Sequence, residues 1–241
     1  MEVEGIFTKT HAVIVAAGTS QRMGGRNKIW IQFDGRSVLE WTLRRFIEAG
    51  VTRGVVVAQP PDHPQIQRVC TALKLGRMHV VSGGSERYLS VMAGLEALAD
   101  ADPDDVVLIH DAARFLVPML LIRRVIAATE EHGAALPVIE VVDTVKAVGP
   151  DGLVKRTVPR RPLGLAQTPQ GFRVGLIQKA YARWEAPTVP TDDAEVAERS
   201  GITVRAVPGD RLNQKLTQPE DVGWFEAVLK GLVDHADGTG V

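Results

Sequence analysis

Short runs of apolar, largely β-branched residues recur along the chain, and longer stretches with helical spacing separate them. The runs occupy residues 12–16, 55–57, 79–81 and 106–109. Nearly continuous apolar runs are typical of strands that are buried on both faces, as in a parallel sheet covered by helices. The alternation therefore predicts an α/β fold with a mostly parallel sheet and helices on both faces.

Signals for helix ends support this alternation. Residues 37–40 (Ser-Val-Leu-Glu) form a capping-box pattern before apolar residues at helical spacing, and Gly50 predicts the end of that helix. Residues 217–220 form a second such pattern with a proline in the first turn, which predicts a C-terminal helix. Thr191 is expected to be the N-cap of a further helix.

One stretch breaks the alternation of strands and helices. Residues 143–158 contain two strand-like pieces around Gly-Pro-Asp-Gly at 149–152, which is a hairpin signal. The sequence contains no internal repeat, low-complexity tract or linker. We therefore expect a single domain over residues 1–241, from which residues 143–158 project as an arm.

Length and composition narrow the class of protein. A chain of 241 residues is more naturally one domain than two, at about 150 residues per domain. The 28 basic and 29 acidic residues leave a formal charge of -1, so no overall field favours nucleic acid or anionic lipid. The only cysteine, Cys70, cannot form an internal disulfide, and no apolar run approaches the ~18 residues of a membrane span. These features predict a cytoplasmic protein of enzyme size.

The loop after the first predicted strand has the composition of an anion site. Residues 16–28 combine glycines, which let backbone N–H groups approach a ligand, with the cations Arg22, Arg26 and Lys28, and this combination suits a triphosphate. The loop lacks the spacing of a Walker A motif and the Gly-x-Gly-x-x-Gly pattern of dinucleotide-binding folds. A glycine-rich surface loop with incidental cations remains the alternative.

Two further strand ends carry candidate chemistry, because ligands of open parallel sheets bind beyond the carboxyl ends of the strands. Asp111 is suited to Mg2+ or a ribose hydroxyl, and equally to capping the following turn or pairing with Arg114. The turn at 82–87, followed by Ser90, suits either a base edge or the start of the next helix. His110 is interpreted as a packed, hydrogen-bonded imidazole without a catalytic role.

Other polar residues are not selected by any spacing rule, and charged side chains of this kind usually lie on solvated faces. They are Lys146, Arg160, Arg161, Thr168, Asp192, Asp193 and Lys215.

Taken in chain order, however, the motifs form a recognisable set. They are Ala16-Ala17-Gly18 with Arg22-Met23-Gly24 and Lys28, Gly83-Gly84 with Glu86-Arg87 and Ser90-Val91, His110-Asp111-Ala112-Ala113-Arg114, Asp143-Thr144-Val145-Lys146, Gln167-Thr168-Pro169-Gln170-Gly171-Phe172, Thr191-Asp192-Asp193-Ala194, and Asn213-Gln214-Lys215 with Thr217-Gln218-Pro219-Glu220-Asp221. This set resembles the 2-C-methyl-D-erythritol 4-phosphate cytidylyltransferase family of the non-mevalonate isoprenoid pathway. The resemblance spans residues 12–221.

The resemblance implies a Rossmann-like nucleotidyltransferase sheet and an enzyme that transfers CMP from CTP to methylerythritol phosphate, with Mg2+ required. By match to the family's motifs, Arg22 and Lys28 would stabilise charge in the transition state. The acceptor phosphate would be positioned by Arg160 and Lys215, with Thr144, Thr168 and Arg114 nearby. The CTP site would be lined by Ala16, Ala17, Gly18, Gly84, Ser85, Ser90, Asp111 and Ala112, with Asp111 as the metal ligand.

The resemblance also implies a homodimer. Family members dimerise through interlocking hairpin arms, which suits residues 143–158 and would let Arg160 serve the neighbouring subunit's site.

The chain departs from the family's pattern at three places. Asn27-Lys28-Ile29-Trp30 stands where the family usually has Pro-Lys-Gln, Phe115 where it favours proline, and Pro159 where an acidic residue is frequent. Three alternatives stay open. A cytidylyltransferase for another polyol phosphate, such as ribitol 5-phosphate, shares most of these motifs, and a related guanylyl- or uridylyltransferase shares the first glycine-rich loop. The altered residues 27–30 also leave open a CTP-binding module without turnover.

Overall fold

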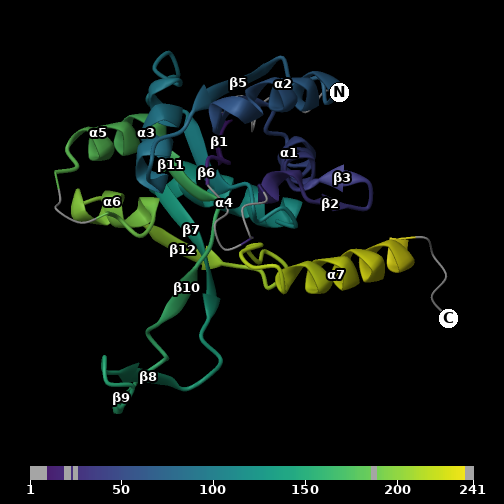
Figure 1. The fold of residues 1–241 in the computed structure, drawn as a ribbon. Coiled ribbons are helices and arrows are strands. Elements are labelled where there is room, and N and C mark those ends of the chain that lie inside the picture. The colour runs from purple at the N-terminus through teal and green to yellow at the C-terminus, as the bar shows by residue number, and fades with distance from the viewer. Residues whose placement is uncertain (1–9, 19–22, 24–26, 186–188, 237–241) are drawn as a thin grey trace.

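The computed structural model describes residues 10–18, 23, 27–185 and 189–236 (Figure 1). A central sheet is flanked by helices on two sides, a thin hairpin projects from one edge, and the last helix extends away from the sheet. Of the helices in these ranges, none combines the length and the hydropathy of a bilayer span.

The four predicted strands form one half of the large sheet and are confirmed. They pair in parallel in the order β5 (Arg77–Ser82), β4 (Arg53–Ala58), β1 (Thr10–Val15) and β6 (Val106–Asp111). Every residue of β6 is buried, as the unbroken apolar run predicts for a strand covered on both faces.

The other half of the sheet mixes strand directions. Here β11 (Gln170–Arg173) lies antiparallel between β6 and β7 (Ala134–Glu140). On β7, β10 (Gly164–Ala166) pairs antiparallel and β12 (Arg205–Pro208) pairs parallel. The prediction of a mostly parallel sheet is confirmed, with this antiparallel insertion as the addition.

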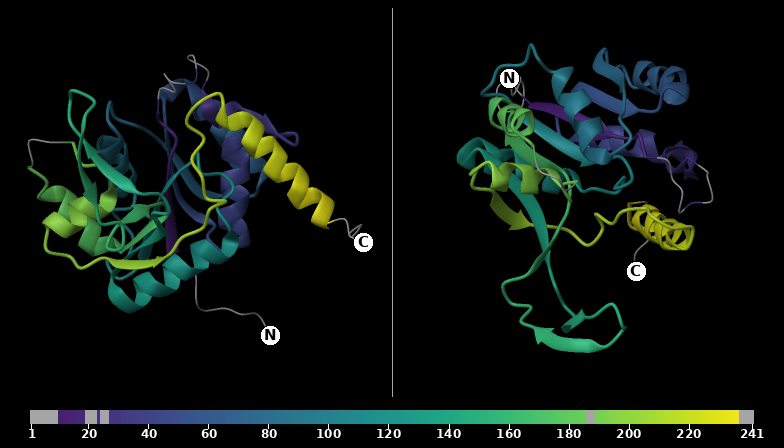
Figure 2. Two further views of the ribbon diagram at one scale, coloured as in Figure 1. Left: turned by 90° about the horizontal axis from the view of Figure 1, so that it is seen from below. Right: turned by 60° about the vertical axis from the view of Figure 1, so that its left-hand side comes forward.

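Helices cover both faces of the sheet, as predicted (Figure 2). Alternate residues of the strands point to opposite sides, so Ile14 and Val13 belong to different core clusters. One cluster contains residues of α1 (Val38–Glu48), α2 (His63–Ala72) and α4 (Met119–His132). The other contains residues of α3 (Arg87–Glu96), α5 (Val174–Ala182) and α6 (Asp193–Arg199).

The predicted N-cap of α1 is confirmed, because the Ser37 hydroxyl accepts a hydrogen bond from the backbone N–H of Glu40 at 3.2 Å. The prediction for Thr191 is wrong by one residue. The N-cap of α6 is Asp192, whose carboxylate accepts from the N–H of Glu195 at 2.9 Å. The Glu195 carboxylate in turn accepts from the N–H and hydroxyl of Thr191, which leaves that hydroxyl engaged outside the helix.

The C-terminal helix α7 (Asp221–Ala236) begins later than the capping-box pattern predicted. The Thr217 hydroxyl donates to the carbonyl of Lys215 at 2.9 Å, so it does not act as the cap. The Asp221 carboxylate instead accepts from the N–H groups of Thr217 and Gln218.

A third apolar cluster fastens α7 to the rest of the molecule. Phe225 contacts Phe115, with ring centroids 4.6 Å apart, and Phe115 stacks on Phe33 at 4.8 Å. Phe33 belongs to a small hairpin of β2 (Gln32–Phe33) and β3 (Arg36–Ser37). The segment that precedes α7 is thereby held next to the loop that follows β6.

The predicted hairpin within residues 143–158 is confirmed as β8 (Val145–Val148) paired antiparallel with β9 (Val154–Val158). It projects from the end of the sheet where β7 and β10 pair (Figure 1). Six of the nine exposed large hydrophobic residues in the described chain lie on this arm and its base: Val142, Val148, Leu153, Val154, Leu163 and Leu165. The arm and its base thus carry most of the exposed large hydrophobic residues in the described part of the chain.

Candidate active site

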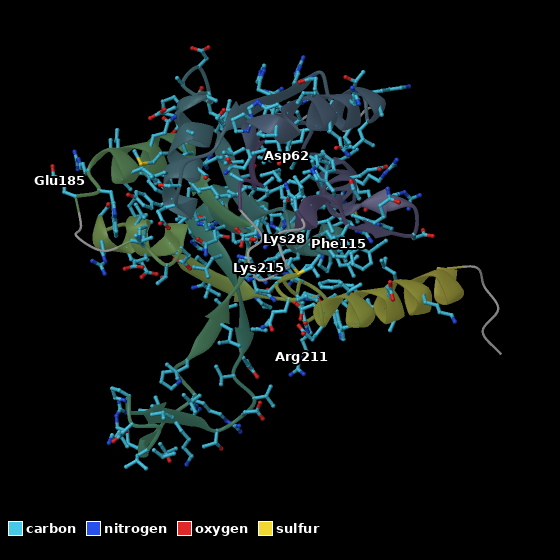
Figure 3. All side chains as sticks on the ribbon, in the orientation of Figure 1. Lys28, Asp62, Phe115, Glu185, Arg211 and Lys215 are labelled. Atoms are coloured by element: carbon cyan, nitrogen blue, oxygen red, sulfur yellow. The ribbon has the colours of Figure 1, made fainter. Side chains whose placement is uncertain are left out.

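Loops that follow β1, β5 and β6 enclose one cavity of about 260 Å³ at the carboxyl ends of the parallel strands. Of the residues predicted for the site, ten line it: Ala16, Ala17, Gly18, Lys28, Gly84, Ser85, Ser90, Asp111, Ala112 and Lys215. Figure 3 shows Lys28 and Lys215 near the middle of the molecule, where the sheet meets the C-terminal segment. The fold thus brings together residues from both ends of the chain.

The loop after β1 and the turn at 82–87 are both hydrogen-bonded to β4, and they lie against each other. Ala16 donates its N–H to the carbonyl of Val57 at 2.7 Å, and Gly83 donates to the carbonyl of Ala58 at 2.9 Å. A Cβ atom on Gly83 would lie 2.3 Å from the Cβ of Ala17. A glycine is therefore required at 83 for the two loops to lie side by side.

Ser90 organises the turn at 82–87 from inside the protein. Its buried hydroxyl accepts from the N–H of Gly84 at 3.1 Å and lies 3.2 Å from the carbonyl of Glu86, to which it donates. The N–H of Gly84 is therefore engaged within the turn, which starts α3 at Arg87. Of the two interpretations of this turn, the geometry of Gly84 favours the start of a helix.

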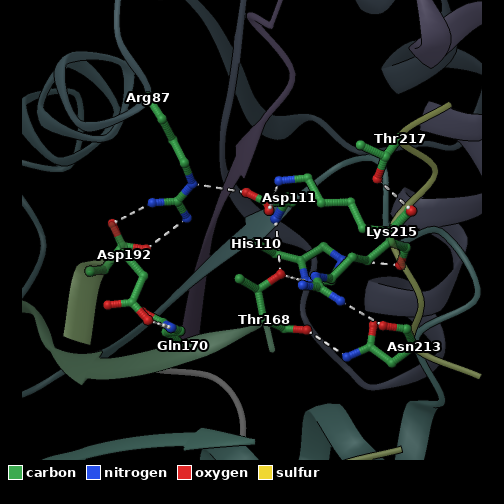
Figure 4. Close-up of polar contacts among 11 residues, drawn as sticks. Arg87, His110, Asp111, Thr168, Gln170, Asp192, Asn213, Lys215 and Thr217 are labelled. Carbon is green, nitrogen blue, oxygen red and sulfur yellow. Dashed lines mark hydrogen bonds and ion pairs between the residues drawn. The ribbon is translucent and has the colours of Figure 1, made fainter. Parts of the chain in front are cut away.

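Asp111, at the end of β6, accepts from two cations (Figure 4). Nε of Arg87 lies 3.0 Å from Oδ1, and Nζ of Lys215 lies 2.7 Å from Oδ2. Burial by itself raises the pKa of the Asp111 carboxyl, but the charges of Arg87 and Lys215 outweigh it and hold that pKa well below its usual range. Asp111 is therefore an ionised carboxylate at the wall of the cavity.

Arg87 is itself held by a second, fully buried carboxylate. Its two terminal nitrogens donate to both oxygens of Asp193 at 3.0 and 2.8 Å, and the hydroxyl of Tyr181 donates to Asp193 at 2.6 Å. Burial alone lowers the pKa of Arg87, but Asp193 and Asp111 raise it above its usual range. Burial and the charge of Asp193 raise the pKa of the Tyr181 phenol, which keeps its proton as a donor.

His110 and Thr168 support Asp111 from behind. The Thr168 hydroxyl accepts from the N–H of Asp111 at 3.2 Å and lies 3.0 Å from Nδ1 of His110, while Nε2 of His110 lies 3.3 Å from the carbonyl of Arg114. A neutral ring with its hydrogen on Nε2 satisfies both contacts. Burial lowers the pKa of His110 to about 3, so the ring is uncharged at neutral pH, in keeping with its predicted packing role.

Lys215 reaches the cavity because buried contacts hold the segment around it. The side-chain amide of Asn213 donates to the carbonyl of Thr168 at 2.8 Å, and Leu216 donates its N–H to the carbonyl of Ala113 at 2.9 Å. Arg114 donates to the carbonyl of Asn213 at 2.8 Å, so the predicted alternative of an Asp111–Arg114 pair is replaced by this contact. Burial lowers the pKa of Arg114, although Asp111 nearby raises it.

Of the remaining predicted site residues, those that the structure describes do not line this cavity. Arg22 and Arg26 lie outside the described residues. Thr144 and Arg160 are exposed on the arm, where the Arg160 guanidinium donates to the carbonyl of Val142. Thr168 lies behind Asp111. Arg114 and Lys215 line a second, more open depression of about 440 Å³ on the side of the arm, together with Glu140, Asp143 and Arg211.

Several residues that line the cavity received no role from the sequence, and two of them, Arg87 and Gln59, make defined polar contacts. Arg87 stands in a quoted motif, but Asp193, its main partner, is 106 residues away, so no spacing rule connects them. Gln59 follows β4, and its amide donates to the carbonyl of Ala17 at 2.8 Å. Its position after a strand end was the only signal that sequence offered.

A single carboxylate, Asp111, is the predicted ligand for Mg2+ in this cavity. Within the described ranges, no three His, Cys, Asp or Glu side chains gather as metal ligands. Asp111 supplies a hard carboxylate, and Mg2+ commonly binds through one or two carboxylates together with substrate phosphates and water. Asp111 therefore suits an ion that arrives with a nucleotide.

Comparisons with known proteins relate the chain to one family. The model of the IspD family, 2-C-methyl-D-erythritol 4-phosphate cytidylyltransferase, matches residues 10–231. A bifunctional enzyme IspD/IspF of Rhodopseudomonas palustris (strain HaA2) is 44% identical over 237 residues, which cover 96% of this chain and 58% of that protein. Its counterpart in Bradyrhizobium sp. (strain ORS 278) is 43% identical over 96% of this chain and 60% of that protein. The chain thus spans about 60% of the length of these curated relatives.

Solved structures give the same result. The 2-C-methyl-D-erythritol 4-phosphate cytidylyltransferase from Thermus thermophilus superimposes with a TM-score of 0.74 at 33% identity, over 90% of this chain and 98% of that one. The 4-diphosphocytidyl-2C-methyl-D-erythritol synthase from Anaerococcus prevotii gives a TM-score of 0.81 at 29% identity, over 92% and 96% of the two chains.

Proposed function

The chain belongs to the 2-C-methyl-D-erythritol 4-phosphate cytidylyltransferase family, and we propose that it transfers CMP from CTP to 2-C-methyl-D-erythritol 4-phosphate. The products are 4-diphosphocytidyl-2-C-methyl-D-erythritol and pyrophosphate. The observation that carries the proposal is the gathering of Lys28, Arg87 and Lys215 with Asp111 around one cavity at the carboxyl ends of the sheet.

The chemistry of this reaction matches such a cavity. A phosphate dianion must attack the α-phosphorus of a polyanion, so charge repulsion is the main barrier and positioning with neutralisation is the main task. The second pKa of a phosphate monoester is about 6, so the attacking oxygen is already deprotonated near pH 7 and needs no general base. A neutral, buried His110 is compatible with that requirement.

We assign each group of residues a separate role in this reaction. The loops at 16–18 and 84–85 form the walls that would hold the nucleotide. Lys28, with Arg22, offsets the charge that develops at the α-phosphate, and Lys215 holds the acceptor phosphate with Arg114 beside it.

Mg2+ is proposed as the cofactor, with Asp111 as its protein ligand. A bound divalent ion supplies charge withdrawal from the triphosphate toward the pyrophosphate leaving group. Because both oxygens of Asp111 already contact cations, Lys215 would leave Asp111 to bind the acceptor phosphate, which would free one oxygen of Asp111 for the ion.

The arm supports a homodimer as the working form. Its exposed apolar residues would be covered by a second copy of the chain, and Arg160 on the arm would then serve the partner's acceptor site together with Thr144. We further propose that residues 1–241 act as a single domain, since β1 and β12 join the same sheet, and that it works in the cytoplasm, since its one cysteine, Cys70, is buried as a free thiol.

A pyrophosphate-release panel tests the function and its rivals together. Purified protein with Mg2+ is given each common nucleoside triphosphate with methylerythritol phosphate, ribitol 5-phosphate or no acceptor. We expect release only with CTP and methylerythritol phosphate. A preference for ribitol 5-phosphate would show that the proposed acceptor is wrong, and a preference for GTP or UTP would show that the proposed nucleotide is wrong. Tight CTP binding without pyrophosphate release would indicate a non-catalytic module.

A further inference from the structure

The carboxylate of Asp62 holds residues on both sides of Lys28. Asp62 ends the short 3-10 helix η3 (Pro60–Asp62), which follows β4. It accepts from Nδ2 of Asn27 at 2.8 Å and from Nε1 of Trp30 at 2.7 Å. Figure 3 shows Asp62 and Lys28 on neighbouring parts of the molecule.

The turn that carries Lys28 has little internal support. It is the 3-10 helix η2 (Lys28–Trp30), and such single turns have weak hydrogen-bond geometry. Asn27 caps it, with Oδ1 accepting from the N–H of Ile29 at 3.3 Å, while its amide nitrogen donates to Asp62. Ile29 is buried beneath the turn. The orientation of the turn therefore depends on Ile29 below it, on Asp62 beside it, and on the N–H of Val38, which donates to the carbonyl of Ile31 at 2.9 Å.

The carboxylate of Asp62 contacts Asn27 and Trp30 and does not cap α2, the helix that follows it. It occupies the N-cap position of α2, where an aspartate side chain commonly accepts from the first turn, yet within the described chain its side chain makes no such cap. The neighbouring Gln59 fastens the same segment to the carbonyl of Ala17 in the first loop. One segment after a central strand thus contacts both walls of the cavity.

We propose that Asp62 is a positioning residue that holds the Lys28 turn so that the ammonium group faces the cavity. The proposal rests on the proposed function, because it assigns Asp62 a task in the same transfer. Hydrogen bonds to an ionised carboxylate are stronger than neutral ones, and a displacement of about 1 Å in a catalytic group can lower a rate about 10²-fold.

The kinetic test compares Asp62→Ala with the control Asp104→Ala. Asp104 is exposed and lies just before β6, at the end of that strand away from Asp111. We expect Asp62→Ala to lower kcat about 10- to 100-fold with KM for CTP changed less than about threefold, because Lys28 is assigned to the transition state. Asp62→Asn keeps one acceptor oxygen and should show a smaller loss. An unchanged kcat in the folded Asp62→Ala protein would overturn the proposal.

A double-mutant cycle separates positioning from general stability. If Asp62 acts through Lys28, adding Asp62→Ala to Lys28→Ala lowers kcat no further. If the two losses multiply, Asp62 acts elsewhere and the proposal is wrong.

Hydrogen exchange gives a readout that needs no turnover. Amides of residues 27–31 should exchange faster in Asp62→Ala and Asp62→Asn than in the wild type or Asp104→Ala, with the melting temperature measured in parallel. If the wild type releases no pyrophosphate, the proposed function fails, and hydrogen exchange alone then tests the role of Asp62. Unchanged exchange at residues 27–31 would overturn the proposal that Asp62 positions the Lys28 turn.

Discussion

At the scale of single residues, the two cations on Asp111 differ in how firmly they are held. Arg87 is bound bidentately by the fully buried Asp193 and is 27% exposed, whereas Lys215 is 36% exposed and reaches Asp111 through one ammonium contact. In the proposed reaction, an incoming phosphate would recruit Lys215 while Arg87 keeps Asp111 oriented. Of the two cations that contact Asp111, Arg87 is thus held on both sides and Lys215 by one contact to Asp111.

Lys28 is the residue whose removal should affect turnover most. Lys28→Ala should lower the rate of pyrophosphate release about 10²- to 10³-fold, by analogy with the loss of one transition-state donor. Far-UV circular dichroism and the affinity for CTP should change little, and Lys179→Ala, an exposed lysine on α5, is the matched control. A folded Lys28→Ala protein with wild-type turnover would remove Lys28 from the mechanism.

His110 should make stability depend on pH. The folded ring has a pKa of about 3, whereas an unfolded histidine takes up a proton below about pH 6.5. The unfolded state then binds more protons, so stability falls as the pH is lowered from 6.5 toward 4, by at most about 1.4 kcal/mol per unit from this group.

Urea unfolding of the metal-free protein at several pH values measures this slope. His110→Gln should flatten it, and His79→Gln, at an exposed position on β5, is the control. An identical slope in His110→Gln would contradict the assignment of a neutral buried ring.

The sequence marks which residues stand at strand ends, but not which ones contact each other. Asp111 is identifiable as a polar residue after an apolar run, yet its partners Arg87 and Lys215 lie 24 and 104 residues away. Local spacing offered Arg114 as the partner, and Arg114 binds the carbonyl of Asn213 instead. Charge pairing of this kind depends on the fold, so only the resemblance to a family pointed to Lys215.

At the scale of elements, hydrophobic periodicity predicted the strands and helices better than the ends of the helices. The four parallel strands follow from unbroken apolar runs, but β11 between β6 and β7 follows from tertiary pairing that periodicity does not encode. Thr191 and Thr217 have the residue type of N-caps, and both hydroxyls bond to other groups. Capping residues compete locally, and the nearby Asp192 and Asp221 bind the backbone N–H groups.

Gly54 is the element-level position that should tolerate substitution least. It lies in β4 opposite Ala12 with a φ of +139°, and a Cβ there would come within 2.0 Å of the carbonyl oxygen of Ala12. Gly54→Ala should cost about 3 kcal/mol in the free energy of unfolding.

Gly223→Ala is the matched control, since a Cβ at that position in α7 meets nothing within 4 Å and alanine favours a helix by up to about 1 kcal/mol. Chemical denaturation compares the two. Equal stability of both variants would show that β1 and β4 separate more easily than their register implies.

At the scale of the whole molecule, the arm separates two groups of predicted site residues. Lys28, Asp111 and Lys215 line the cavity, whereas Thr144 and Arg160 are exposed on the arm. In the proposed homodimer, each site would take its arm residues from the other subunit.

Mixed dimers test that division. Lys28→Ala and Arg160→Ala proteins, each nearly inactive alone, are unfolded together and refolded at equal amounts. Random pairing makes half of the dimers hybrid, and each hybrid has one site with both residues intact, so about a quarter of wild-type activity should return. No recovery, with hybrids demonstrated by mass spectrometry, would place Arg160 in its own subunit's site.

The most direct test of the account follows the phosphorus atoms of CTP. The purified protein is given Mg2+, methylerythritol phosphate and CTP labelled at either the α- or the γ-phosphate. Attack at the α-phosphorus predicts that the α label appears in the cytidine-linked alcohol and the γ label in pyrophosphate. Transfer of the γ label to the alcohol, or no product from bound CTP, would contradict it.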